Sequence, residues 1–152
     1  MTRIDMGKQA GVVLIEALLG ILIFSIGILA LIGMQSVAVK NTTDARYRTE
    51  AAYLANNILS QIRLDMANVN LYPDSSIFAY APRTTWRNQV EAQLPGIKIV
   101  SAQRVPSIAI APGPTYPGDT DAPSQVTVII LWLQPGETQE RRFEIVGYVS
   151  RL

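Results

Sequence analysis

The stretch Gly11-Val12-Val13-Leu14-Ile15-Glu16 ends in a carboxylate, which lies in a segment that is otherwise apolar. The next charged residue after Glu16 is Lys40. Residues 17–34 are 18 residues without a charge. As a helix they would span about 27 Å, close to the thickness of a bilayer core. We therefore predict a membrane-spanning helix. A glutamate near the bilayer centre costs about 2.5 kcal/mol or more, which makes Glu16 the first candidate functional residue.

A short polar segment, residues 1–11, precedes this run and carries Arg3 and Lys8 against Asp5. Positive charge favours the cytoplasmic side, so the predicted orientation has the N-terminus inside and the rest of the chain outside. Two ordinary alternatives stay open. One is a secretory signal peptide cleaved after Ser36-Val37-Ala38, and the other is a plain anchor whose glutamate reaches the lipid headgroups.

The order of these features resembles the type IV pilin superfamily. In that family a short basic leader ends in glycine, a prepilin peptidase and N-methyltransferase acts there, and glutamate is the fifth mature residue. Gly11 matches the glycine and Glu16 matches the glutamate. The resemblance implies cleavage after Gly11, which leaves Val12 as the first mature residue. The family usually has an N-methylated phenylalanine at this position, and valine departs from that norm.

Cleavage before Val12 would create a cationic amine one helical turn from Glu16, on the same helix face. Within one subunit the two charges would partly neutralise each other. Between subunits, the glutamate of an entering protein could meet the amine of one already assembled, and a low dielectric strengthens such a pair. Glu16 is therefore predicted to act in assembly.

Composition excludes several classes of function. The 152 residues include no histidine and no cysteine, so the commonest general base, the usual zinc ligands and a thiol nucleophile are missing. We expect no enzyme activity, no cofactor and no disulfide. Removing Arg3, Lys8 and Asp5 from 13 basic and 12 acidic residues leaves 11 of each, so bulk charge predicts no nucleic-acid binding.

The helical pattern continues beyond the apolar run, because residues 35–68 contain neither proline nor glycine. Apolar or small residues recur every three or four positions, at Tyr47, Ala51, Leu54, Ile58, Ile62 and Met66. We predict one long helix whose second half packs on a domain. Residues 1–11 are then a leader, 12–35 a membrane or filament-core helix, and 36–152 a globular domain that includes the amphipathic half of the helix.

The remainder predicts a small antiparallel sheet, and hence an α+β, pilin-like fold. Residues 97–105, 125–133 and 141–149 are rich in valine and isoleucine. Residues 133–137 look like a hairpin turn, after which Arg141, Arg142 and Glu144 should be exposed. Three or four strands are expected, a fourth coming from residues 77–80 or 107–110.

Two connecting regions complete the prediction. Residues 71–83 have the composition of a loop, and residues 85–94 form a short helix with Trp86 in the core and Thr84 or Thr85 as its cap. Residues 111–123 form a long loop rich in proline and glycine. Its Asp119 and Asp121 fall short of the six to eight oxygens that calcium takes, so no metal site is predicted.

Within the superfamily, residues 23–35, 52–58 and 62–63 resemble the PilV group of minor pilins, also called pilus modification proteins. The resemblance implies a low-copy subunit that supports pilus assembly and hence adhesion, twitching motility or DNA uptake. Its implied partners are other minor pilins, the major pilin and the assembly platform of the inner membrane. The implied location is the inner membrane before assembly and the pilus afterwards. A minor pseudopilin of type II secretion is the alternative.

Overall fold

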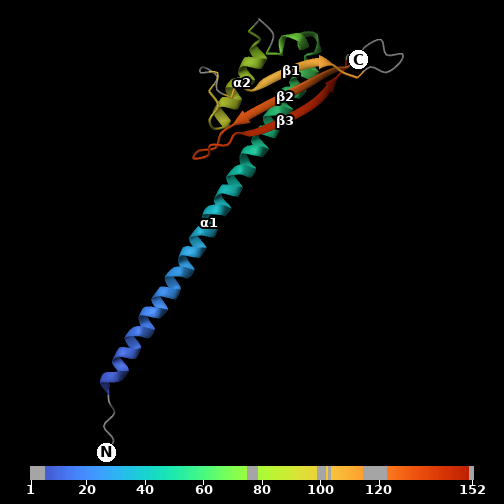
Figure 1. The fold of residues 1–152 in the computed structure, drawn as a ribbon. Coiled ribbons are helices and arrows are strands. Elements are labelled where there is room, and N and C mark those ends of the chain that lie inside the picture. The colour runs from blue at the N-terminus through green and yellow to red at the C-terminus, as the bar shows by residue number, and fades with distance from the viewer. Residues whose placement is uncertain (1–5, 75–78, 99–101, 103, 115–122, 151–152) are drawn as a thin grey trace, which may run out of the picture. The chain divides into compact units, whose positions relative to one another are not determined.

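The computed structural model describes residues 6–74, 79–98, 102, 104–114 and 123–150, with side chains from Gly11 onward. Its elements are α1 (Met6–Leu64), a 3-10 helix η1 (Met66–Leu71), α2 (Ala81–Gln93), β1 (Ser107–Pro112), β2 (Ser124–Trp132) and β3 (Arg141–Val149) (Figure 1). The fold is α+β, as predicted. The chain divides into two compact units, Met1–Thr43 and Asp44–Leu152, and each is described by itself.

The long helix is confirmed, and it ends slightly earlier than predicted. α1 covers 59 residues without a break and ends at Leu64 rather than near Asn68. Asp65 leaves the helical conformation, with φ −118° and ψ 47°. Its N–H bonds to the carbonyls of Gln61 and Ile62 at 3.0 and 3.2 Å, which tightens the last turn. The chain then continues as η1.

The sheet has three antiparallel strands in the order β1-β2-β3. Its register is continuous, from Ser107↔Ile129 to Pro112↔Ser124 and from Ser124↔Val149 to Trp132↔Arg141. The strands predicted over residues 125–133 and 141–149 are confirmed. The segment at 107–110, offered as an alternative strand, is β1 and extends through Pro112 into the predicted loop.

The prediction of a strand over residues 97–105 is wrong for those residues of this range that the structure describes. Only Lys98 forms an isolated bridge there. Ala102 and Arg104 have φ values of 54° and 51°, which lie in the left-handed region and prevent a strand. In the other candidate, residues 77–80, Ala79 and Tyr80 have no regular structure, and 77–78 lie outside the described residues. Asp119 and Asp121 also lie outside them.

Helix α2 begins at Ala81, four residues before the predicted start. Pro82 lies in its first turn, where proline costs no hydrogen bond because those N–H groups have no partner in the helix. The predicted threonine cap is wrong: Tyr80 is the N-cap, and the Thr84 hydroxyl donates to the Tyr80 carbonyl at 3.1 Å. Pro82 was therefore a helix-start signal and not part of a loop.

The core lies between the second half of α1, α2 and one face of the sheet. The predicted α1 stripe is confirmed, with Ala51, Leu54, Ile58 and Ile62 at most 1% exposed. Trp86 is buried, as predicted, and its indole N–H donates to the Leu54 carbonyl at 2.9 Å, which joins α2 to α1. Four alternate residues of β2 face this core: Val126, Val128, Ile130 and Trp132.

The predicted turn between β2 and β3 is confirmed. The Glu137 N–H donates to the Gln134 carbonyl at 3.1 Å, and Gly136 adopts φ +80°. Arg142 and Glu144 are exposed as predicted, but Arg141 is not. Its side chain is 29% exposed, because it turns back to contact Glu137 and Asp44.

Candidate functional site

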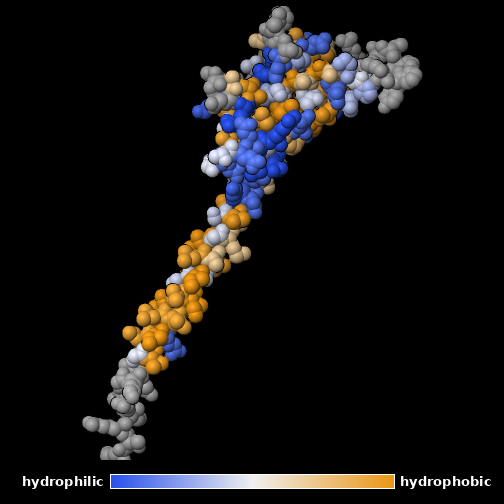
Figure 2. Space-filling model, viewed as in Figure 1, coloured by the Kyte–Doolittle hydropathy of each residue, from blue (hydrophilic) through white to orange (hydrophobic). Residues whose placement is uncertain are grey.

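The first unit presents a continuous apolar surface. Between Val12 and Val39 the large apolar side chains are exposed, from 41% at Ile28 to 72% at Met34. Figure 2 shows the apolar residues of this helical stretch together. The helix Gly11–Leu64, which contains this stretch, is the one candidate membrane span found among the described residues, by its length and composition. An apolar surface of this extent requires cover from lipid or protein.

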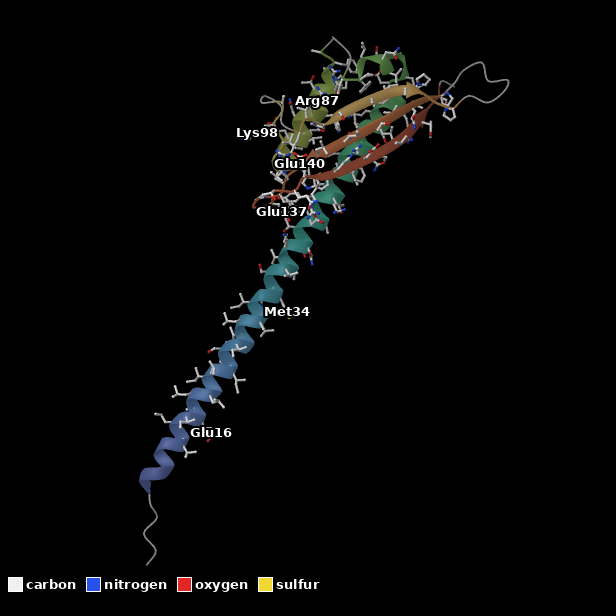
Figure 3. The ribbon with its side chains drawn as sticks, in the orientation of Figure 1. Glu16, Met34, Arg87, Lys98, Glu137 and Glu140 are labelled. Carbon is white, nitrogen blue, oxygen red and sulfur yellow. The ribbon has the colours of Figure 1, made fainter. Side chains whose placement is uncertain are left out.

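Gly11, Val12 and Glu16 all lie on α1 in this segment. Val12 and Glu16 are four residues apart, so they project from one face of the helix. Glu16 is exposed, and no hydrogen bond or ion pair joins it to another described residue (Figure 3). Within one chain, therefore, Glu16 is a carboxylate open to a partner.

The glycines of this segment have no packing role within the described chain. A Cβ built on Gly20, Gly27 or Gly33 meets nothing within 4 Å. Glycines in membrane helices either allow another helix to approach closely or reflect their ordinary frequency there. Close approach at these three glycines would require a second molecule.

The second unit has a polar cluster around Asp44 that composition alone did not reveal. Asp44 accepts hydrogen bonds from Arg48 Nε at 2.8 Å and from Gln134 Nε2 at 2.6 Å, and Arg141 Nε lies 3.6 Å away. The hydrogen bond from Arg48 is the largest effect that lowers the Asp44 pKa. The cluster ties α1 to the β2–β3 turn.

A similar cluster fixes β1. The Asp74 N–H donates to the Ile108 carbonyl at 3.1 Å, and the Ile108 N–H donates to the Asp74 carboxylate at 3.3 Å. Arg87 pairs with the same carboxylate and also donates to the Pro106 carbonyl at 3.2 Å. Burial raises the Asp74 pKa more than Arg87 lowers it. These contacts hold β1 in place, and this structural role accounts for them.

The third cluster lies where α1 ends. The Asp65 carboxylate accepts from Asn68 Nδ2 at 2.8 Å, from the Tyr72 hydroxyl at 3.1 Å and from the Tyr80 hydroxyl. The two tyrosine rings meet edge to face, with centroids 4.9 Å apart. The Tyr80 hydrogen bond lowers the Asp65 pKa most, and burial followed by the carboxylate raises the Tyr72 pKa. The sequence signal that could have pointed to this cluster is Asp65 itself, a lone aspartate directly after the last turn of the predicted amphipathic helix.

Among the described side chains, no three His, Cys, Asp or Glu residues converge as metal ligands would. No protein-family model matches the chain, and neither curated proteins nor solved structures include a significant match to it. The resemblance to pilins therefore rests on the N-terminal residues themselves.

Proposed function

We propose that this chain is a minor pilin of the PilV-like group. It would be made as a precursor, cleaved after Gly11, held in the inner membrane by residues 12–35 with its N-terminus inside, and then drawn into a type IV pilus. It would act with other minor pilins, the major pilin and the assembly platform. Its contribution to adhesion, motility or DNA uptake would follow from its support of pilus assembly.

One observation carries this proposal: the only carboxylate among the exposed apolar residues 12–39 of α1 lies five residues after a glycine that follows a short basic segment. A plain anchor has no need of this order. The continuation of the same helix into an α+β domain also supports the proposal, because pilins are expected to combine these two parts.

The test is to recover sheared surface filaments from cells that carry a tagged chain, and to compare cells that lack it. The proposal predicts a low-copy component of the filaments and fewer filaments in its absence. Absence from pili, with loss of protein export when the gene is deleted, would instead identify a minor pseudopilin of type II secretion.

A further inference from the structure

A hollow of about 480 Å³ lies between the end of α1 and the first part of α2. Its lining includes Gln61, Leu64 and Asp65 from the α1 side and Pro82, Trp86 and Gln89 from α2. All these residues belong to the second unit. The proposed assembly function gives this hollow no role.

The walls of the hollow are mainly apolar, and one apolar residue that lines it is exposed to solvent. Leu64 is 90% exposed, the highest value among the large apolar side chains of the described chain. Pro82 extends the apolar wall, while the buried Trp86 holds its place through the hydrogen bond to Leu54. The apolar part of a ligand could therefore cover Leu64 and bury its side chain from water without disturbing the core.

The polar end of the hollow carries an uncompensated negative charge. All three donors to Asp65 are neutral groups, and no ion pair joins Asp65 to a described cation. Arg87 pairs with Asp74 and Arg83 donates to the Pro73 carbonyl, so the arginines of α2 are engaged elsewhere. The C-terminal end of α1 adds negative potential at the same point.

Open acceptors flank this charge. A carboxylate has about four acceptor positions, and three donors reach Asp65, so one position remains. The side-chain amides of Gln61 and Gln89 make no hydrogen bond to another described residue. Their carbonyl oxygens can accept further N–H groups.

We propose that this hollow binds an arginine side chain presented by a partner protein. Arginine combines an apolar stem, which suits Leu64 and Pro82, with a planar group of five N–H donors. That group matches one carboxylate flanked by two amide carbonyls. The proposal does not depend on the pilin assignment.

The test uses the full chain, labelled with ¹⁵N, in detergent micelles, and N-acetyl-arginine methylamide as the probe. The two tryptophan indole N–H signals report separately, because Trp86 lines the hollow, whereas Trp132, at the end of β2, is buried in the core and does not line it. We expect a saturable shift of the Trp86 signal alone. The neutral citrulline analogue has the same shape, and it should bind about tenfold or more weakly, the factor that 1.4 kcal/mol of charge-assisted bonding gives.

Variants locate the site. Asp65→Asn should abolish the preference for arginine over citrulline, while Glu144→Gln, an equal charge change on exposed β3, should preserve it. If Asp65→Asn fails to fold, Gln89→Glu provides the complementary test, because a second carboxylate should tighten arginine binding several-fold. No saturable shift, equal binding of both probes, or arginine preference retained in a folded Asp65→Asn chain would each overturn the proposal.

Discussion

Glu16 is exposed on α1, and at the residue scale its role follows from what a carboxylate does in an apolar setting. It has no partner among the described residues, so a partner supplied by a second subunit would satisfy its charge. Val12 lies one turn away and would supply an amine after cleavage. If the chain is processed as proposed, Gly11 would set where the mature chain begins, and only then would Val12 carry an amine one turn from Glu16.

Replacing Glu16 therefore tests assembly separately from membrane insertion. Glu16→Ala should insert and be processed normally, because the change makes the helix more apolar. Its recovery in sheared filaments should fall about tenfold or more, as expected if 1.4 kcal/mol or more of pairing is lost. Met34→Ala, which alters another exposed position of the same helix, is the control. Equal recovery of the two variants would support a passive anchor.

Asp44 gives a prediction about pH. Its pKa is lowered in the folded chain, first by Arg48, so its contribution to stability is present above its unfolded pKa of about 3.8 and is lost as the pH falls through the lower folded value. Urea unfolding should show a smaller loss of stability on acidification for Asp44→Asn than for the parent. Asp74, whose pKa is raised, changes stability with pH in the opposite direction. Because Asp74 is present in both chains, its contribution cancels when Asp44→Asn is compared with the parent. An unchanged pH dependence in Asp44→Asn would show that the cluster contributes nothing.

At the scale of secondary-structure elements, the sequence predicted correctly those elements whose apolar residues recur at a regular spacing. The α1 stripe, β2, β3 and the turn between them follow from spacing and from the Pro135-Gly136 pair. Errors arose where a local signal has two meanings. Pro82 starts a helix as readily as it marks a loop. After Gly96, Ile97 and Val105 have no regular structure, and the backbone is left-handed at Ala102 and Arg104. The Asp65 cluster brings together residues up to 15 positions apart, so only tertiary structure reveals it.

Gly147 tests how β3 packs on α1. A Cβ at this position would lie 2.6 Å from Leu59 Cδ2, and Leu59 is buried. Gly147→Ala should lower the free energy of unfolding by about 1–3 kcal/mol, as expected for overpacking. The double variant Gly147→Ala/Leu59→Ala should lose less than the sum of the single changes, because the residues share one contact. Simple additivity in urea unfolding would contradict this packing.

At the scale of the whole molecule, the two units have different requirements for cover. The exposed apolar side chains of the first unit end at Val39, whereas the core of the second unit is formed by its own residues. A truncated chain that begins near Asn41 should therefore be folded and monomeric. Near-UV circular dichroism and sedimentation would check this. Aggregation without a near-UV signal would show that the second unit depends on the first.

Prepilin processing after Gly11 is tested by the N-terminal mass and sequence of the protein taken from its native envelope. We predict a chain that starts at Val12, with or without a methyl group, and an unprocessed precursor for Gly11→Leu. A start at Met1 would contradict it in favour of a plain anchor, and a start near Val39 would contradict it in favour of an ordinary signal peptide.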